Sequence, residues 1–377
     1  MNRRHFLTTS STSLLASSFL STRLLATRLR ADDNDVTIHD TRIISKQPQK
    51  YHGWPTLARR SNGELVVVCS GGRVAHVCPY GQVEIIRSKD DGKTWTWPRV
   101  LLDGPIDDRD AGVLETAKGS LLVTTFTSNA YESGLAKNEE WKSLHERIPA
   151  EARRTELGTW MIRSTDGGVS WSARYDSKLN SPHGPVQLKD GRLLYAGKNL
   201  WRDEVRVGVC HSTDDGQSWE WLADIPTREG DLLKNYHELH AIEAADGTIV
   251  VHIRNHNSNN SGETLQTESK DGGKTWNQPH PIGVWGLPSH LLRLSDDRLL
   301  MSYGHRRKPF GNQARVSSDN GATWSSPYSI SKDGLGGDLG YPSTVQLADG
   351  SLITVWYERM SQGPMAVLRL AHWSLPK

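Results

Sequence analysis

The sequence predicts an all-β protein, a six-bladed β-propeller, and two kinds of repeat carry that prediction. The first is the pattern Ser-x-Asp-x-Gly-x-(Ser/Thr)-Trp, which occurs five times at intervals that match one propeller blade with variable loops. The second is a tight polar turn between two apolar runs, which is typical of a β-hairpin. It occurs six times, so we expect six blades. The eight-residue patterns begin at Ser88, Ser164, Ser212, Ser269 and Ser317.

The six hairpins follow one another along the chain, and each turn precedes a returning apolar strand. The last unit ends in the apolar run 366–371 without an eight-residue pattern. We expect residues 36–39 to supply its outer strand, which would close the ring and leave no free edge. A charged insertion, 132–154, lacks the repeat and is expected to form a helix or a lid over one face. The turns lie at Asn62-Gly63, Lys118-Gly119, Asp190-Gly191, Asp246-Gly247, Asp296-Asp297 and Asp349-Gly350.

The N-terminus has the pattern of an export signal. Arg3 and Arg4 precede a Phe-Leu pair and a weakly apolar Ser/Thr/Leu/Ala stretch, as in a twin-arginine signal. We expect residues 1–31 to be this signal and residues 32–377 to be an exported propeller, either periplasmic or secreted. Arginines interrupt the apolar stretch, so it is not a membrane span.

Charge and cysteine content exclude several classes of protein. The chain has 45 basic and 43 acidic side chains, and residues 1–31 hold five arginines and no acid, so the remainder is slightly acidic. Nothing resembles a nucleic-acid footprint. The three cysteines do not make a disulfide framework, and no Cys-rich or His-Glu-x-x-His pattern occurs. We therefore expect neither a metal nor another cofactor, and the sequence predicts no oligomeric state.

The hairpin geometry locates a candidate site. If every hairpin turn lies on one rim of the propeller, the starts of the first strands and the ends of the second strands share the opposite rim. That rim collects titratable side chains from all six blades, which favours a functional pocket at the central mouth. The candidates are His52, Arg73, His76, Arg109, Asp110, His183, Glu238, Arg254, His290, Arg306 and Tyr341.

The eight-residue pattern resembles the Asp-box, or BNR repeat, of the sialidase (neuraminidase) superfamily. In it Asp accepts backbone N–H bonds, Gly supplies an unusual backbone angle and Trp packs between blades. The resemblance covers essentially residues 50–377. Segment 235–255 is similar to the family's segment with a Glu beginning an inner strand and an Arg ending the next, and segment 340–358 is similar to the one that holds its nucleophilic Tyr.

The resemblance implies roles for four residues. Tyr341 would be the nucleophile and Glu238 the base that takes its proton, while Arg254 and Arg306 would hold the substrate carboxylate; Arg307 competes with Arg306. The chemistry explains these residue types. Guanidinium groups grip a carboxylate in bidentate fashion, and that carboxylate would repel an anionic nucleophile. A neutral tyrosine avoids the repulsion but needs a base, because its pKa lies near 10.

Two departures from the family pattern bear on the substrate. Where the family has a Tyr-Arg-Ile-Pro-like segment, this chain reads Tyr51-His52-Gly53-Trp54-Pro55, and the loop 73–81 lacks the family's acid/base Asp. Arg73 or Arg109 could replace the lost guanidinium, and His76 or Asp110 could supply the proton. Residues 107–110 could instead form a salt-bridge cluster on the rim. His52, His183 and His290 are further candidates for substrate binding.

We expect an exported glycosidase that releases a terminal acidic sugar, sialic acid or a related ulosonic acid, with retention. The first alternative is a polysaccharide lyase, in which Tyr and His act as base and acid while Arg neutralises a uronic acid. The second is a propeller that binds carbohydrate without catalysis, because a propeller fold does not fix an activity. A saturated product would exclude the lyase, and binding without turnover would favour the third.

Overall fold

The structure is a computed structural model that describes residues 36–258, 261–360, 363 and 365–376, all of which belong to one compact unit, Asn34–Lys377. The expected export signal, residues 1–31, lies outside the described residues. Within the described ranges no helix combines the length and apolar character that a membrane crossing requires.

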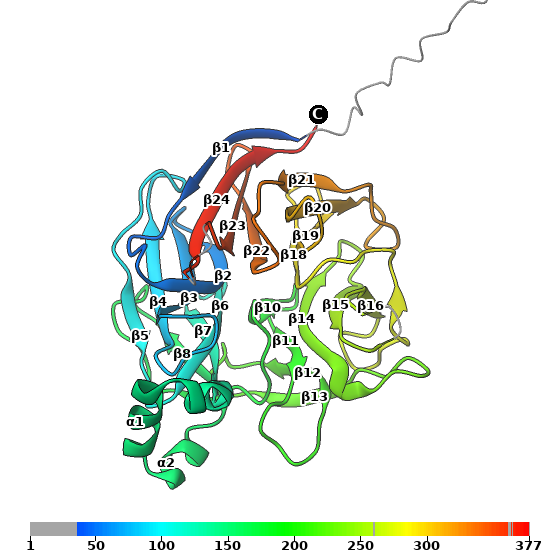
Figure 1. The fold of residues 1–377 in the computed structure, drawn as a ribbon. Helices are drawn as coiled ribbons and strands as arrows, with labels where there is room; N and C mark the ends of the chain where they lie inside the picture. Colours follow the sequence, from blue (N-terminus) through cyan, green and yellow to red (C-terminus); the bar gives the residue numbers. More distant parts are fainter. Residues whose placement is uncertain (1–35, 259–260, 361–362, 364, 377) are drawn as a thin grey trace, which may run out of the picture. The chain divides into compact units, whose positions relative to one another are not determined.

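Six four-stranded antiparallel sheets follow one another in chain order around a ring, which confirms the predicted six-bladed β-propeller (Figure 1). In five of them the strands pair in chain order, first with second, second with third and third with fourth. Blade one contains β2 (Tyr51–Arg59), β3 (Leu65–Arg73), β4 (Gln82–Ser88) and β5 (Arg99–Leu102). Blade two contains β6 (Asp107–Glu115), β7 (Leu121–Ser128), β8 (Thr159–Ser164) and β9 (Tyr175–Asp176). Blade three contains β10 (Val186–Gln187), β11 (Leu193–Lys198), β12 (Val207–Ser212) and β13 (Glu220–Asp224).

The second half of the ring repeats this plan. Blade four contains β14 (Tyr236–Glu243), β15 (Ile249–Asn255), β16 (Thr264–Ser269) and β17 (His280–Pro281). Blade five contains β18 (Ser289–Arg293), β19 (Leu299–His305), β20 (Gly311–Ser317) and β21 (Tyr328–Ser331). Blade six contains β22 (Leu339–Gln346), β23 (Leu352–Glu358), β24 (Val367–Ser374) and β1 (Thr37–Ile43). A short 3-10 helix, η2 (Leu233–Asn235), precedes blade four.

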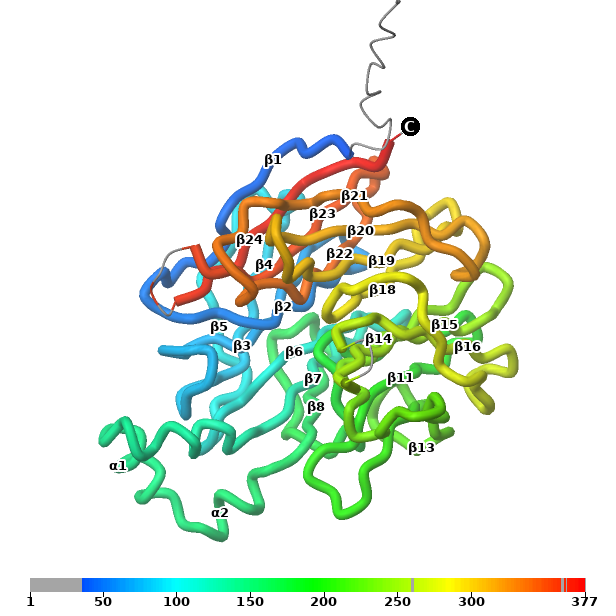
Figure 2. Tube along the Cα trace, turned by 45° about the vertical axis from the view of Figure 1, so that its right-hand side comes forward, coloured from blue at the N-terminus to red at the C-terminus, as the bar shows by residue number. Residues whose placement is uncertain are grey.

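The last blade is completed by the first described strand, as the sequence predicted. β1 runs antiparallel to β24, with Thr37 opposite Ser374 and Ile43 opposite Arg369. Figures 1 and 2 both show β1 alongside β24. Because β24 has a partner on each side, blade six presents no unpaired β24 edge.

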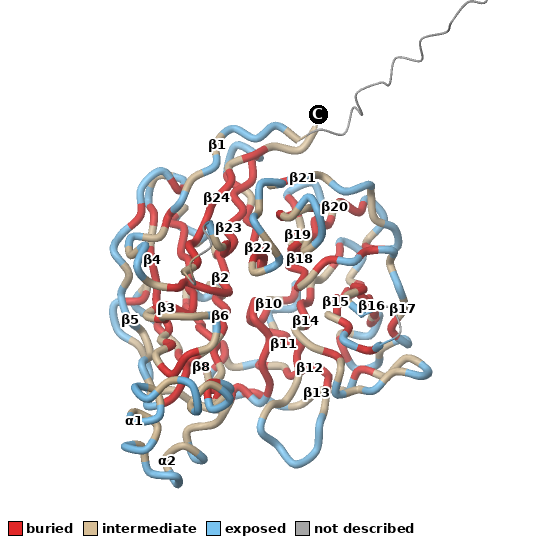
Figure 3. The backbone as a smooth tube through the Cα atoms, in the orientation of Figure 1, coloured by how far each residue is buried: buried red, intermediate tan, exposed pale blue. Residues whose placement is uncertain are grey.

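The second strands are buried on both faces. In β3, residues 65–68 have essentially no solvent exposure. Val66 and Val68 pack with Val113 of blade two, while Leu65 and Val67 pack in a different cluster. Neighbouring blades cover both faces, so these strands are continuous apolar runs rather than alternating ones. Figure 3 shows the same contrast, with burial along the inner strands and exposure at the periphery.

The Asp-boxes hold the ends of the third strands. In the first box the Ser88 hydroxyl accepts the Gly92 N–H at 2.9 Å, and Asp90 accepts both the N–H and the hydroxyl of Thr94 at 2.9 and 2.6 Å. The Thr94 hydroxyl is the main reason why the pKa of Asp90 falls to about 2. Ser88 pairs with Leu65, directly after a hairpin turn, so the Asp-boxes lie on the turn rim and leave the opposite rim for the mouth.

The insertion between β7 and β8 is helical, as one of the two expected forms. It consists of the 3-10 helix η1 (Ala130–Lys137), α1 (Glu139–Arg147) and α2 (Ala150–Thr155). The Asn138 side chain caps α1 by accepting the Trp141 N–H at 3.0 Å. Glu140 accepts a 2.7 Å hydrogen bond from Tyr80 of blade one. Since β7 ends at the mouth rim, the insertion begins on that rim, at the lower left of Figure 1.

Candidate active site

Four inner strands share an unusual backbone position near the mouth. One residue in each of β2, β6, β14 and β22 has a positive φ between 44° and 53°, and the pairing with the second strand shifts at that point in all four. A non-glycine residue in this region costs on the order of 1–3 kcal/mol, and such strain is common at functional sites. The four residues are Trp54, Asp110, Glu238 and Tyr341.

The predicted nucleophile and base are in direct contact. The Tyr341 hydroxyl donates to Glu238 Oε1 at 2.5 Å. Arg254, at the end of β15, donates from Nη1 to Glu238 Oε2 at 2.5 Å and to the Tyr341 oxygen at 3.2 Å. The structure thus brings Tyr341, Glu238 and Arg254 into one hydrogen-bonded triad, although residues 238 and 341 lie more than a hundred positions apart.

Arg306, and not its neighbour Arg307, lies against Tyr341. Its guanidinium carbon is 5.7 Å from the centre of the Tyr341 ring, and its Nε donates to the Leu339 carbonyl at 2.9 Å. Arg307 instead stacks at 5.7 Å from the Trp285 ring and donates to the Trp285 carbonyl. The geometry therefore favours Arg306 as the second guanidinium beside the nucleophile.

Burial and charge set the protonation states of this triad. Burial raises the pKa of Tyr341 well above its usual value, and the charge of Glu238 raises it further against the opposing effect of Arg254. Burial by itself would raise the pKa of Glu238, but the charge of Arg254 and hydrogen bonds from Tyr341 and Arg254 bring it below its ordinary value. At neutral pH the resting site thus holds a neutral phenol beside a carboxylate.

The two candidate proton donors occupy different surroundings. Asp110 is buried, and burial raises its pKa to about 7, with the charge of Glu238 adding to the effect and that of Arg109 opposing it. His76 is 47% exposed, and its Nδ1 lies 2.8 Å from the Tyr51 hydroxyl and 3.0 Å from Asp338. Asp110 therefore shares the electrostatic environment of Glu238, whereas His76 belongs to a neighbouring cluster.

The structure separates the two arginines that could replace the missing blade-one guanidinium. Arg73 is fully buried, pairs with Asp107 at 2.5 Å and donates to Ser70 and to the His76 carbonyl. A side chain at Gly81 would begin 2.0 Å from Asp107, so glycine leaves room for this pair. Arg73 is thus a structural cation, and its predicted part in substrate binding does not fit its buried, saturated guanidinium.

Arg109 is in the opposite situation. Its guanidinium stacks 4.4 Å from the Trp54 ring centre, and its ion pair with Asp107 is long, at 3.6 Å. Arg73 also stacks on Trp54, with its guanidinium carbon 4.9 Å from the ring centre. Residues 107–110 are therefore partly the expected salt-bridge cluster, through Asp107, while Arg109 keeps donors that face no carboxylate at hydrogen-bonding distance.

The three histidines proposed to bind substrate are all buried. His52 lies 3.7 Å from Glu84 inside blade one, and burial lowers its pKa to about 4. His183 and His290 pack against each other, with ring centres 5.0 Å apart, and His183 also contacts the Tyr341 ring at 6.4 Å. Burial lowers the pKa of His290 to about 3. All three histidines are thus buried among other side chains, and their part in substrate binding stays a prediction.

A further cluster beside the nucleophile was not predicted. Asp338 accepts hydrogen bonds from Tyr51 at 2.9 Å and from Tyr357 at 3.1 Å, and Tyr357 packs 5.8 Å from Tyr341. Asp338 lies three residues before Tyr341 and two residues before the segment 340–358 that resembles the family, and no motif marked it. Its position just before an inner strand was the only available signal.

Metal binding finds no support among the described residues. They contain no group of three or more His, Cys, Asp or Glu side chains that could hold a metal ion. His237 and His240 have different ring neighbours: His237 contacts His256 at 4.6 Å, and His240 stacks on His290 at 4.7 Å.

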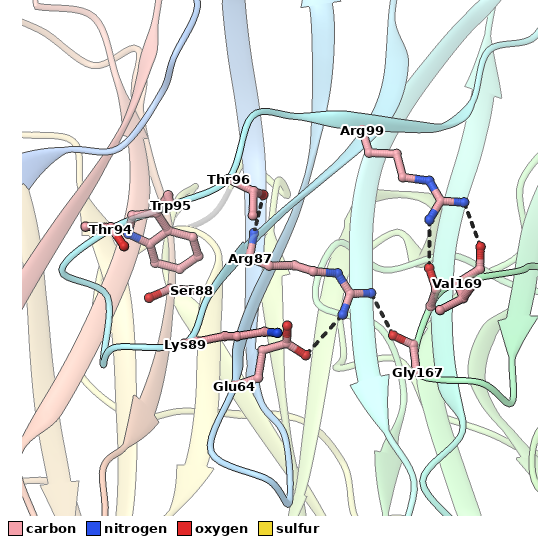
Figure 4. A pocket seen from close by; sticks show the side chains of 11 residues that line it. Glu64, Arg87, Ser88, Lys89, Thr94, Trp95, Thr96, Arg99, Gly167 and Val169 are labelled. Carbon is pink, nitrogen blue, oxygen red and sulfur yellow. Dashed lines mark hydrogen bonds and ion pairs between the residues drawn. The ribbon is translucent and has the colours of Figure 1, made fainter.

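A pocket of about 570 Å³ lies away from this site, between the first two Asp-boxes (Figure 4). It contains two arginines whose donors are engaged. Arg87 donates to Glu64 and to the Gly167 carbonyl, and Arg99 donates to the carbonyls of residues 168 and 169. These bonds join blade one to blade two, so the pocket is a seam between blades.

Fold and site define a propeller of the sialidase type, and comparison with known proteins agrees. The sequence model of the BNR repeat-like domain matches residues 136–354, and the chain belongs to that family. The "Sialidase" of Bacteroides fragilis is 26% identical over 309 residues, covering 73% of this chain and 54% of that protein. The chain spans about half the length of the curated sialidases that it matches.

Solved structures show the same fold. A Dyadobacter fermentans protein of unknown function superposes with a TM-score of 0.75 at 24% identity, and the match covers 90% of this chain and 99% of that protein. The intramolecular trans-sialidase of Ruminococcus gnavus gives a TM-score of 0.63 at 15% identity, covering 91% and 97% of the two chains. At these identities the likeness establishes the propeller fold, and the resemblance to the sialidase superfamily is confirmed.

Proposed function

We propose that the protein is a sialidase-like glycoside hydrolase that releases a terminal acidic sugar, sialic acid or a related ulosonic acid, with retention of configuration. One observation carries this proposal: the Tyr341 hydroxyl donates to Glu238 at 2.5 Å while Arg254 contacts both groups. A neutral phenol with an adjacent carboxylate base is the nucleophile that suits a substrate whose reacting carbon already bears a carboxylate.

In the first step the Tyr341 oxygen attacks the anomeric carbon as its proton passes to Glu238, and the bond to the leaving oxygen breaks as that oxygen receives a proton. In the second step water attacks the anomeric carbon and gives a proton to the group that protonated the leaving oxygen, the bond between the sugar and Tyr341 breaks, and the phenolate recovers its proton from Glu238. The resting pKa values oppose early proton transfer, since that of Tyr341 is raised and that of Glu238 lowered. Transfer is therefore coupled to the attack, which consumes the developing phenolate.

The substrate carboxylate would be held by three guanidinium groups. Arg254 and Arg306 flank Tyr341, and Arg109 approaches from the Trp54 face. Bidentate guanidinium–carboxylate pairs are strong and orient the anion. On this arrangement the guanidinium missing from blade one is supplied by blade two, with Trp54 as its platform.

We propose Asp110 as the proton donor to the leaving group. A carboxyl group with a pKa of about 7 is largely protonated at mildly acidic pH and can both donate and recover a proton in the neutral range. His76 remains the alternative donor, supported by its exposure.

The 2.8 Å contact between Tyr51 and His76 favours a second candidate function. A Tyr–His pair beside arginines could carry out β-elimination on a uronic acid, so a polysaccharide lyase is the competing reaction class. We also propose that the protein acts outside the cytoplasm, on the evidence of Arg3-Arg4 and the following apolar stretch. Cell fractionation with and without an Arg3→Lys, Arg4→Lys change tests that proposal.

The deciding experiment incubates the protein with α-linked sialosides and with uronic-acid oligosaccharides and identifies products by mass spectrometry. Tyr341→Phe is expected to lose at least about a thousandfold in kcat/KM, because a phenyl ring has no nucleophilic oxygen. Tyr328→Phe, on the outer strand of blade five, is the matched control and should keep full activity.

Release of a saturated acidic sugar by the wild type and not by Tyr341→Phe would support the proposal. A product lighter by one water would assign the lyase reaction instead. Binding of acidic sugars without any product would assign a carbohydrate-binding propeller.

A further inference from the structure

A smaller pocket adjoins the proposed site on the blade-five side. Its volume is about 230 Å³, and it is lined by residues 261–262 and by Trp285, Leu287, Gly304, Arg306 and Arg307. Arg306 lines this pocket and also stacks on Tyr341. The pocket is therefore next to the arginines that are proposed to hold the substrate carboxylate.

Two glycines bring the pocket close to the nucleophile. A side chain at Gly304 would begin 3.0 Å from the Gly340 Cα and 2.7 Å from the Leu287 carbonyl oxygen. Gly340, which directly precedes Tyr341, has a φ of 119°, a conformation that side-chain-bearing residues rarely adopt. The backbone at Gly304, which lines the pocket, therefore packs directly on the backbone at Gly340, and Gly340 is the residue before Tyr341.

The pocket carries positive charge, and no acidic residue lines it. Its lining contains two arginines. Among the described residues, neither Arg306 nor Arg307 takes part in an ion pair. Arg306 uses Nε for the Leu339 carbonyl, and Arg307 uses Nη2 for the Trp285 carbonyl, so each keeps further donors. Arg306 also holds the carboxylate of the released sugar in the proposed mechanism, so a second anion would pair with Arg307.

The pocket also presents an aromatic surface. Trp285 is 40% exposed, and the hydrogen bond from Arg307 to its carbonyl keeps the guanidinium 5.7 Å from the ring centre. An exposed indole offers an apolar plane for the C–H face of a sugar ring, while the adjacent guanidinium suits an acidic substituent on that ring.

We propose that this pocket is a leaving-group subsite for a second anionic sugar, one that bears a carboxylate or a sulfate and is linked directly to the acidic sugar being released. The inference rests on the proposed function and narrows its substrate class. The favoured substrate is then a run of at least two charged sugars, rather than one acidic sugar that caps a neutral glycan.

The test compares kcat/KM on substrates that differ in the leaving sugar: sialyllactose, whose leaving sugar is neutral, α2,8-linked disialic acid, which supplies a carboxylate, and sialyllactose sulfated on galactose. We expect the wild type to favour a charged leaving sugar by about tenfold, the effect of one well-placed ion pair. Preference for only one of the charged substrates identifies the anion that the pocket accepts. The preference should shrink as salt concentration rises.

Arg307→Ala is expected to abolish the preference while leaving kcat/KM on sialyllactose within about twofold, and Arg307→Lys should restore part of it. Trp285→Ala should raise KM for all three substrates, because each leaving sugar would lose its contact with the indole. Arg298→Ala removes the same charge from the opposite rim of blade five and is the matched control; it should change nothing. Arg307 is exposed, so its replacement leaves the core intact.

Equal kcat/KM on all substrates in the wild type would overturn the subsite and leave the proposed function standing, as would an Arg307→Ala variant that lost activity equally on all of them. Failure to cleave any substrate would count against the proposed function instead. Calorimetric titration with disialic acid would then decide the subsite: weaker binding by Arg307→Ala than by Arg298→Ala supports it, and equal binding overturns it.

Discussion

The two ends of the propeller strands follow opposite rules. At the turn rim, five Asp-boxes repeat the same bonds, and hydrogen bonds from neighbouring Thr or Ser side chains keep their carboxylates ionised, as for Asp90. At the mouth, the side chains differ from blade to blade, and burial is the main influence on their pKa values, as for Asp110 and Tyr341. The repeated residues of the Asp-boxes thus stabilise the ring, whereas the residues that differ between blades form the candidate site.

The contrast is clearest where the backbone itself repeats. Trp54, Asp110, Glu238 and Tyr341 share one left-handed conformation in four inner strands but carry four different functional groups. The same bulge thus serves as a platform, a proton donor, a base and a nucleophile in the proposed mechanism. Changes at the mouth should therefore alter activity, whereas changes at the turn rim should alter stability.

Glu238→Gln is expected to have the largest effect in the mouth. Glutamine can accept the Tyr341 hydrogen bond but cannot take its proton, so kcat should fall by about a thousandfold. Glu358→Gln is the matched control, because Glu358 is also a buried partner of an arginine, Arg369. It should lower the melting temperature and leave kcat nearly unchanged. Similar kcat losses in both variants would remove the distinction between the base and an ordinary ion pair.

Asp110→Asn should lower kcat/KM by about a hundredfold on substrates with a poor leaving group, and much less on aryl glycosides, whose leaving group needs no proton. In the wild type, kcat/KM should decline as pH rises through about 7, because the donor loses its proton there. Asp110→Asn should lack this decline.

Asp108→Asn is the control for this pH dependence. Burial also raises the pKa of Asp108 to about 7, but its carboxylate accepts the Gly104 N–H at 2.7 Å. Its variant should keep the decline in kcat/KM. A decline that persisted in Asp110→Asn and vanished in His76→Gln would assign the proton donor to His76.

The raised pKa of Asp110 also bears on stability. The folded state holds a proton that the unfolded chain releases above about pH 4, so the free energy of unfolding should fall as pH rises from about 4 to about 7. Asp110→Asn should reduce that dependence and leave the part that Asp108 contributes, which denaturant titrations at several pH values would measure.

The two arginines that stack on Trp54, Arg73 and Arg109, should respond differently to replacement by alanine. Arg109→Ala is expected to raise KM by about tenfold with little change in unfolding, because it removes one guanidinium from the proposed clamp. Arg73→Ala leaves Asp107 buried without its partner, which typically costs about 3–5 kcal/mol, and should show mainly as a loss of stability. Parallel unfolding and kinetic measurements separate the two, and a stability loss in Arg109→Ala would contradict the assignment.

The smallest effect on activity is expected at the turn rim. Asp319 accepts hydrogen bonds from the Thr323 N–H, the Thr323 hydroxyl and the Ser317 hydroxyl. Asp319→Ala should lower the melting temperature by about 2–4 °C and leave kcat/KM within about twofold. A large loss of activity in this variant would show that the two rims are coupled.

The sequence predicted the parts of the molecule that depend on repetition or on a resemblance. The six blades and the closing strand β1 follow from the order of the hairpins. The approach of Glu238 to Arg254 follows from it too, because residues 237 and 254 face each other across adjacent strands. The contact between Tyr341 and Glu238 joins blades four and six, and the resemblance alone suggested it.

The position of one candidate histidine, His52, has a local physical cause. β2 contains two register shifts, between residues 51 and 56, and each shift by one residue turns the following side chains to the other face. Nothing in the sequence marks these shifts, so the directions of the His52 and Trp54 side chains could not be predicted from it. A positive φ in a tryptophan or a tyrosine has no local sequence signal, since the surrounding fold enforces it.

The pairing of β1 with β24 has a consequence for how the chain comes to be folded. Thr37 in β1 pairs with Ser374 in β24. The first described strand to be synthesised therefore cannot pair until the last one has been made. Contacts of such sequence separation form slowly. Until β24 has been synthesised, β1 has no partner strand and blade six is incomplete. The ring can therefore close, and fold as one cooperative unit, only after β24 has paired with β1.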